Sequence, residues 1–274
     1  MKGRPARTLL LHLVMIMGAL LTLGPLLWMI SASFMADGEA NSFPPRFVPE
    51  NPTLAHYRDL FGRMDLARHL FNSIVITVLA TLLSVLFNSL AGYGFAKLPL
   101  PGREKLFRAL SAGLVIPAQV GMLPLFLLLR EMGFINTYAG VLVPYAASIY
   151  GIFLVRQYTL GLSDDLLDAA RVDGAGELRV FAMVALPVIR PILVTLAAFT
   201  FLSAWNDFMW PLVILSDSAR YTLPVALANL VGEHVQDTEL MMAGSVITTL
   251  PALLAFLLFQ RTYVRGITAG SVKG

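Results

Sequence analysis

Long apolar runs separated by short polar segments set the pattern of this chain. A membrane-spanning helix needs about 20 mostly apolar residues to cross a hydrocarbon core of about 30 Å. Six runs have that length, and we predict a transmembrane helix in each: residues 9–30, 70–96, 109–129, 135–155, 191–216 and 240–259. The connections between them are too short to bury a separate core. The pattern therefore predicts an all-α membrane protein in which residues 1–274 form a single transmembrane domain.

The first run has a second interpretation, because a cleavable signal peptide also follows a basic segment. The apolar part of a signal peptide usually has about 7–15 residues, fewer than the run at 9–30. We therefore expect this run to remain as an uncleaved span.

The connection at 163–191 differs from the others because its sequence predicts two short helices around a turn. Ser163 is suited to cap the first helix, and Gly174 to end it in a left-handed conformation. The second helix follows at once, and we expect Pro187 and Pro191 to limit it. The result is a helical hairpin with both apolar and charged faces.

The charge distribution predicts which side of the membrane each connection faces. Hydrophobic residues make up 57% of the chain and charged residues only 14%, against roughly 25% in soluble domains. The net charge of +3 comes from Lys and Arg scattered between apolar runs, which argues against a nucleic-acid surface. With the N-terminus inside, 14 of the 20 Lys and Arg lie on the inner side. Both termini and the 163–191 connection are therefore predicted to be cytoplasmic.

Motifs for catalysis and metal binding are missing from the sequence. The chain contains no cysteine, no GxxxxGK[ST] phosphate-binding loop, no HExxH and no GxSxG. Its four histidines, His12, His56, His69 and His234, lack the spacing of metal ligands. We therefore predict neither an enzyme nor a metal site.

Polar residues within the apolar runs are the remaining candidates for a functional site. Gln119 and Tyr145 fall near the middle of their spans, and Asn206 and Asp207 lie in the outer part of the fifth. Such residues often mark a solute pathway. The alternative is that Gln119, Asn88 and Asn206 hydrogen-bond between helices, and that Asp207 is hydrated at the outer interface. We therefore predict that the wall of a solute pathway contains four polar side chains that can bind a polar solute: Gln119, Tyr145, Asn206 and Asp207.

Four classes of membrane protein have to be compared for a chain with six spans and no catalytic site. An ion-coupled secondary transporter would show internal repeats and acids near the midplane, and neither is visible. A channel subunit and a membrane-bound scaffold remain open. A chain that has no nucleotide motif but exposes a cytoplasmic hairpin fits best a subunit driven by a separate motor.

One segment of the 163–191 connection carries a strong resemblance. Its sequence is DAARVDGAGELRVFAMVALPVIRP, which resembles the EAA loop of permease subunits of bacterial ABC importers. The matching positions are Asp168, Ala169 and Ala170 for EAA, Asp173, Gly174 and Ala175 for DGA, and then Phe181, Leu186, Pro187 and Pro191. Stretches such as GYGFAKLPLPGR and AWNDFMWPL extend the resemblance over nearly the whole chain, to the smaller maltose/glycerol-phosphate-type permease.

The resemblance implies a function, a location and a set of partners. It implies a bacterial inner-membrane importer of a sugar or related polar solute, whose second, larger permease completes the path. Two copies of an ATP-binding subunit would bind ATP and Mg, an extracytoplasmic protein would deliver the solute, and this chain would bind no cofactor. The EAA loop would dock on the ATPase, and the tail at 267–274 would reach towards it. Asp168 departs from the family's usual Glu and has a shorter reach.

Overall fold

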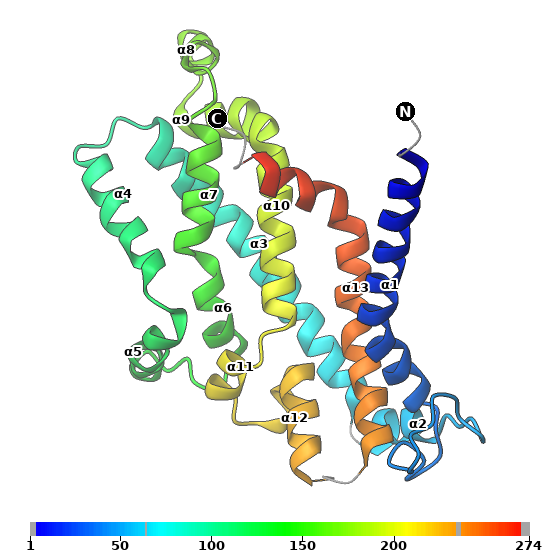
Figure 1. Cartoon of the computed structure of the whole chain (residues 1–274). Helices are drawn as coiled ribbons and strands as arrows, with labels where there is room; N and C mark the ends of the chain where they lie inside the picture. The colour runs from blue at the N-terminus through cyan, green and yellow to red at the C-terminus, as the bar shows by residue number, and fades with distance from the viewer. Residues whose placement is uncertain (1–3, 64, 234–236, 270–274) are drawn as a thin grey trace. The chain divides into compact units, whose positions relative to one another are not determined.

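The computed structural model describes residues 4–63, 65–233 and 237–269, and every regular element in these ranges is helical (Figure 1). In chain order the α-helices are α1 (Arg4–Ala32), α2 (Ala55–Arg63), α3 (Leu66–Lys97), α4 (Arg103–Ala112), α5 (Ala118–Glu131), α6 (Tyr138–Ala146), α7 (Ile149–Thr159), α8 (Asp164–Val172), α9 (Glu177–Val180), α10 (Leu186–Trp205), α11 (Met209–Ile214), α12 (Leu223–Glu233) and α13 (Thr238–Ala269). Two 3-10 turns, η1 (Gly113–Val115) and η3 (Ser218–Arg220), and one π-helical turn, η2 (Phe181–Ala185), complete the set in these ranges. The predicted all-α class is confirmed.

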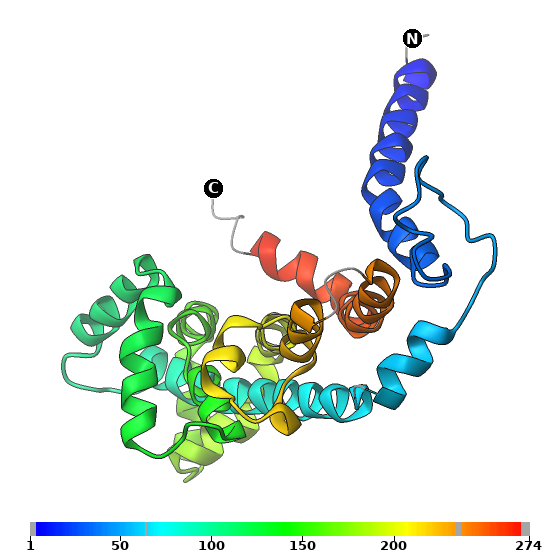
Figure 2. The same ribbon diagram turned by 90° about the horizontal axis from the view of Figure 1, so that it is seen from below.

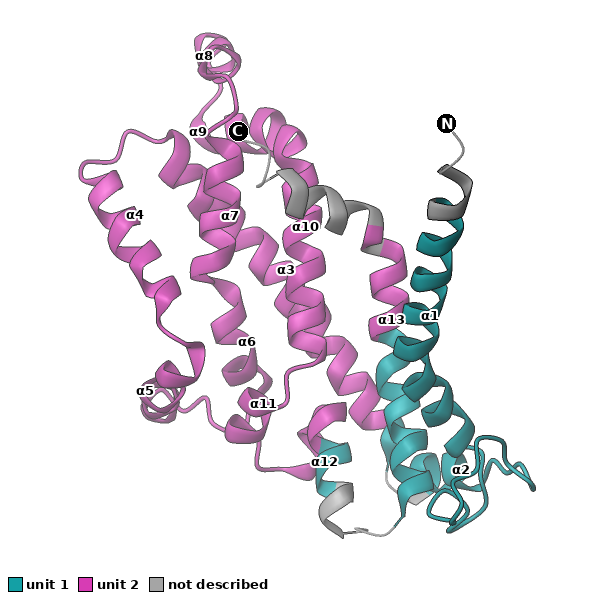
Figure 3. Ribbon diagram, viewed as in Figure 1, with its two compact units in different colours: residues 1–67, 226–251 teal, residues 68–225, 252–274 magenta. Residues whose placement is uncertain are grey.

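The chain divides into two compact units, coloured separately in Figure 3. Unit 1 contains residues 1–67 and 226–251, and unit 2 contains residues 68–225 and 252–274. Helices α3, α12 and α13 each cross the boundary between these segments. The single domain predicted over 1–274 stays a prediction.

Five helical segments are long and apolar enough to cross a membrane: Thr8–Ala32, Leu66–Lys97, Tyr138–Thr159, Glu177–Trp205 and Thr238–Leu258. A sixth is present only if α4, η1 and α5 are counted together as one span. The predicted number of six spans thus depends on that pair of helices.

The span predicted at 109–129 is not one straight helix, because α4 with η1 and α5 meet at an angle of 108°. Pro117 supplies the physical reason. The residue before a proline is pushed out of the helical region, and Ile116 is extended at φ −82° and ψ 121°. Helix α5 then starts again at Ala118, directly after Pro117.

The prediction that Pro187 and Pro191 limit the second hairpin helix is wrong. The backbone stays helical from Glu177 through η2 and α10 to Trp205. A proline in a helix clashes with the carbonyl four residues earlier and lacks an N–H. Here the wider π turn comes just before Pro187, and its backbone bond runs from the Leu186 N–H to the Phe181 oxygen.

The fifth predicted span, 191–216, ends earlier than expected. Helix α10 stops at Trp205, and the chain turns at Asn206 before the short α11. This break places Asp207 between two helices and not inside one.

The core of unit 2 forms where α3, α7 and α10 pack together (Figures 1 and 2). Tyr93, Val155 and Leu193 bring side chains from the three helices into one buried cluster. Gly92 allows α3 and α7 to approach closely, because an added Cβ would lie only 2.7 Å from the Val155 Cβ. A larger residue at this position would force the two helices apart.

Unit 1 is stabilised by two carboxylates that accept backbone N–H groups. Glu239 is 1% exposed and accepts a hydrogen bond from the Ala40 N–H at 2.7 Å. Glu39 accepts the N–H groups of Glu50 at 2.7 Å and Ala36 at 3.1 Å. Because both bonds favour the charged carboxylate, they hold the pKa of Glu39 below its usual value.

Candidate functional site

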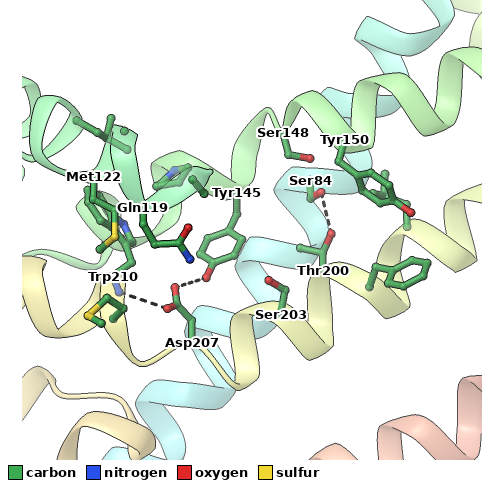
Figure 4. Close-up of a pocket in the computed structure, with 17 residues that line it drawn as sticks. Ser84, Gln119, Met122, Tyr145, Ser148, Tyr150, Thr200, Ser203, Asp207 and Trp210 are labelled. Atoms are coloured by element: carbon green, nitrogen blue, oxygen red, sulfur yellow. Dashed lines mark hydrogen bonds between the residues drawn. The ribbon is translucent and has the colours of Figure 1, made fainter. Parts of the chain in front are cut away.

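A pocket of about 760 Å³ lies within unit 2, between the bend at α5, the α6–α7 junction, α10 and α11 (Figure 4). Its polar lining consists of hydroxyl, amide and carboxylate side chains: Ser84, Gln119, Tyr145, Ser148, Tyr150, Thr200, Ser203 and Asp207. Apolar and aromatic side chains such as Met122 and Trp210 line the rest. No Lys, Arg or His lines this pocket in the described part of the chain. The arrangement can hydrogen-bond a polar, uncharged molecule from several directions.

Asp207 and Tyr145 form the shortest polar contact between pocket side chains. The Tyr145 hydroxyl donates to Asp207 Oδ2 at 2.5 Å, and the Trp210 backbone N–H donates to Asp207 Oδ1 at 3.3 Å (Figure 4). Asp207 reaches both partners because the chain leaves α10 at Asn206 and begins α11 at Met209. The carboxylate therefore joins α6 to the start of α11 while facing the pocket.

A buried hydrogen-bond chain supports the side of the pocket formed by α3. Ser84 and Thr200 hydroxyls lie 3.0 Å apart, which connects α3 to α10. Asn88 is fully buried and donates to the Ser84 hydroxyl at 2.8 Å, while its Oδ1 accepts the Ser148 N–H at 2.9 Å. Asn88 thus fixes the break between α6 and α7, which matches the alternative of an interhelical hydrogen bond.

The structure brings together three of the four residues predicted for the solute path. Gln119, Tyr145 and Asp207 line the pocket. Asn206 does not line it, because its Nδ2 donates to the Leu202 oxygen of its own helix at 2.8 Å. The role of all four in solute transport stays a prediction.

Sequence reasoning missed the hydroxyl side chains that line much of the pocket. Thr200, Ser203 and Asp207 follow one another at intervals of three and four residues, which places them on one face of α10 and its end. That spacing was a usable signal. Ser84 and Ser148 had no such signal, because only the packing of α3 against α10 and α7 brings them to the pocket.

The predicted helical hairpin consists of α8, a turn, and α9. Gly174 has φ +82°, the left-handed conformation expected after a helix. The Gly174 N–H donates to the Arg171 oxygen and the Ala175 N–H to the Ala170 oxygen, both at 3.0 Å, which closes a Schellman motif. Ser163 occupies the N-cap position, but its side chain makes no capping hydrogen bond.

Arg171 connects both sides of the hairpin to α3. Its guanidinium forms ion pairs with Asp168 at 2.6 Å and Glu177 at 2.7 Å. The Tyr93 hydroxyl of α3 donates to the same Glu177 carboxylate at 3.3 Å. The hydrogen bonds to Glu177 and then Asp168 raise the pKa of Arg171 above its usual value. These contacts link the two sides of the hairpin to each other and to α3.

A second contact fixes the start of the hairpin. Lys97, at the end of α3, donates to Asp164 Oδ1 at 2.7 Å and to the Leu162 oxygen at 2.6 Å. The hydrogen bond from Lys97 and its positive charge hold the pKa of Asp164 below its usual value. Near this contact, Leu167 is fully buried and joins the core of unit 2.

The residues predicted for coupling fall into three classes of exposure. Those exposed are Asp168, Ala169, Asp173, Gly174 and Pro187, those half-buried are Ala170 and Ala175, and Phe181 is buried. The Phe181 ring lies 5.2 Å from the Tyr93 ring, so Phe181 anchors the hairpin to α3. Three large apolar side chains are also exposed on the hairpin: Leu166, Val172 and Leu178. The predicted coupling roles stay predictions.

Comparison with known proteins places the chain in a family. Residues 88–268 match the family described as binding-protein-dependent transport system inner membrane component. The chain belongs to this family. The match includes the hairpin and every residue of the pocket except Ser84.

Curated relatives resemble this permease over nearly its full length. The arabinooligosaccharides transport system permease protein AraQ of Halalkalibacterium halodurans is 38% identical and aligned over 93% of each chain. The trehalose transport system permease protein SugB of Mycobacterium tuberculosis is 32% identical, with 91% of this chain and 92% of the relative covered. The lactose transport system permease protein LacG of Rhizobium radiobacter is 30% identical, with 95% and 94% covered.

A solved structure shares the fold. A chain of a bacterial ABC transporter involved in the import of the acidic polysaccharide alginate matches with a TM-score of 0.84 at 22% identity. The match covers 95% of this permease and 98% of that chain.

Membership of the family establishes what kind of protein this is. The chain is a multi-pass inner-membrane permease of an ABC importer, part of a system that depends on a binding protein. The family consists of transport permeases, so this chain is not an enzyme. The predicted resemblance is confirmed, and the secondary transporter, the channel and the scaffold are set aside.

Proposed function

We propose that this permease forms, with a second and larger permease, the path for an uncharged carbohydrate. An extracytoplasmic binding protein delivers the carbohydrate, and two copies of an ATP-binding subunit supply the driving force. ATP and Mg bind to those subunits. Both termini and the hairpin lie in the cytoplasm, as the Lys and Arg distribution predicts.

The lining of the pocket is the observation that carries the proposal. Each sugar hydroxyl can donate and accept a hydrogen bond, and the pocket offers hydroxyls, an amide and a carboxylate to meet them. The single charged lining group among the described residues, Asp207, can accept from hydroxyls but repels a carboxylate or phosphate. The relatives named for arabinooligosaccharides, trehalose and lactose support the same class of solute.

The exposed surface of the hairpin supports its role as the ATPase-docking element. Small residues there, including Ala169 and Gly174, allow a partner to approach closely, and Val172 and Leu178 are 87% and 77% exposed. Arg171 already satisfies the Asp168 carboxylate, so docking rests on these apolar and small residues more than on a new ion pair. Closure of the ATPases would push this hairpin and, through Tyr93, α3.

A sugar panel tests the proposed substrate class. The complete complex is reconstituted in proteoliposomes with its binding protein, and ATP hydrolysis is measured with neutral oligosaccharides and with uronic-acid oligosaccharides of matched length. We expect stimulation by a neutral oligosaccharide and none by the acidic series. Stimulation by acidic oligosaccharides alone would refute the proposed substrate.

A further inference from the structure

A second pocket in unit 2 lies where α3 ends and α4 begins, and it has a volume of about 540 Å³. Four basic side chains line it, Lys97, Arg103, Lys105 and Arg108, against a single acid, Glu104. Neither the solute pocket nor the hairpin surface includes this group of residues. The positions of these residues fit the inner-side excess of Lys and Arg, but that excess does not explain why four of them line one pocket.

The single acid of this pocket offsets only part of its positive charge. Glu104 Oε1 is held by Arg156 at 2.6 Å, from outside the pocket lining, and lies 3.8 Å from Arg103 Nε. The Arg156 guanidinium also lies 3.9 Å from the centre of the Phe107 ring. Glu104 is thus already paired with Arg156, and it leaves Lys105 and Arg108 without an ion pair among the described residues.

Two of the four basic side chains are held by contacts within the chain, and the other two are free to bind a ligand. Lys97 is engaged by Asp164 and the Leu162 oxygen, and Arg103 donates to the Ala96 and Leu98 oxygens. Lys105 makes no ion pair or hydrogen bond within the described ranges. Arg108 donates there only through Nε, to the Glu104 carbonyl oxygen. Lys105 and Arg108 are both exposed, so their charged ends can reach an anion.

The position of the pocket along the chain indicates where that anion comes from. Helix α3 is a candidate membrane span that ends at Lys97, and α4 begins the bent pair that can form another span. The pocket therefore lies at the level where apolar helices leave the membrane. Leu100 lines the pocket and is 49% exposed, and Leu106, which follows Lys105 in α4, is 61% exposed, so apolar side chains lie beside the basic ones.

We propose that this pocket binds the phosphate of an anionic phospholipid headgroup. Lys105 and Arg108 bind the phosphate oxygens, because Arg and Lys are the side chains that pair best with phosphate. Leu100 and Leu106 contact the start of the acyl chains. Free phosphate would make the same contacts with Lys105 and Arg108 but would gain no binding free energy from the leucines. A lipid is therefore the favoured occupant.

Native mass spectrometry of the full chain in detergent tests the site. The probes are dioleoyl-phosphatidylglycerol, the zwitterionic dioleoyl-phosphatidylcholine and inorganic phosphate, each titrated separately. A basic residue beside an anionic surface changes affinity about fivefold, so Lys105→Gln with Arg108→Gln is expected to weaken phosphatidylglycerol binding about 25-fold. Phosphatidylcholine binding should be weak in both proteins.

Two further variants make the result specific. Lys105→Arg with Arg108→Lys keeps both charges and should keep the lipid bound. Arg58→Gln with Arg130→Gln removes two other exposed arginines and should also leave binding unchanged. Equal binding of phosphatidylglycerol to the wild-type chain and the double glutamine variant would overturn the proposal. Displacement of the lipid by equimolar inorganic phosphate would overturn it as well, because the site would then select free phosphate.

Discussion

At the scale of single residues, Asp207 combines a structural and a proposed binding role. It accepts the Tyr145 hydroxyl and the Trp210 backbone N–H, and it remains one of the groups that line the pocket. In asparagine the amide oxygen can accept the Trp210 N–H, and the Tyr145 hydroxyl can turn to accept from the amide N–H, so the charge can be removed while both contacts remain. This property makes the residue suitable for a direct test.

Asp207→Asn is expected to leave assembly of the complex intact and to lower sugar-stimulated ATP hydrolysis about tenfold. The factor corresponds to one hydrogen bond to a charged group, about 1.5 kcal/mol. The measurement is the ATPase rate of proteoliposomes against sugar-loaded binding protein. Asn206→Ala is the neighbouring control, because its side chain does not line the pocket, and it should respond as the unaltered chain does. An unchanged sugar response in Asp207→Asn would remove Asp207 from the path.

Arg171 is a second single residue that can be tested. It pairs with Asp168 and Glu177 and, through Glu177, is connected to Tyr93. Arg171→Gln is expected to cost about 1 kcal/mol or less in stability, since the pairs are exposed. Its larger effect should be to lower the amount of sugar transported per ATP hydrolysed, because a hairpin without these ion pairs transmits less movement to α3. Both rates are measured in the same proteoliposomes.

A double-mutant cycle with Glu177→Gln separates this role from a general loss of charge. The two substitutions should be less than additive in the transport-to-ATPase ratio, because each breaks the same link. Arg179→Gln removes an exposed arginine of α9 that has no ion pair among the described residues, and it should leave the ratio unchanged. Full additivity of Arg171→Gln and Glu177→Gln would rule out the link.

At the scale of elements, the hairpin was predictable because its signals are local. Gly174 is required by a left-handed backbone, and the Schellman motif follows from it within five residues. The path of α10 was not predictable, since a π turn upstream of Pro187 lets the helix continue. The bend at Pro117 is likewise a local feature, because the residue before a proline avoids the helical region.

Gly174→Asp tests the hairpin as a docking element. An added Cβ meets no atom within 4 Å, so the change costs only backbone strain, about 1–2 kcal/mol. We expect the protein to insert and the substrate-stimulated ATPase activity of the complex to be abolished, because a charge now occupies the docking surface. Insertion is followed by membrane fractionation, and activity in the reconstituted complex.

Two controls separate charge from strain. Gly174→Ala imposes the left-handed strain without the charge and should keep part of the activity. Gly176→Asp adds the same charge at φ −69°, where aspartate is a favourable N-cap for α9. Normal transport by Gly174→Asp would contradict the assignment of Gly174 to the docking surface.

At the scale of the whole molecule, the sequence determined the class of the protein and its family. Helix length and composition are local properties, so the apolar runs at 9–30, 70–96 and 240–259 correspond to helices in the structure. The EAA-like loop is also a local feature, and the spacing of its residues was enough to indicate an ABC importer permease. These conclusions depend only on properties of single segments.

Only the tertiary structure decided which polar residues meet. It placed Asp207 in a break between helices, gave Asn88 a packing role, and brought Ser84, Ser148 and Thr200 to one pocket. It also showed that Asp168 is already paired within the hairpin. The physical reason is that a polar side chain in an apolar helix must find a partner, and the sequence does not say on which helix that partner lies.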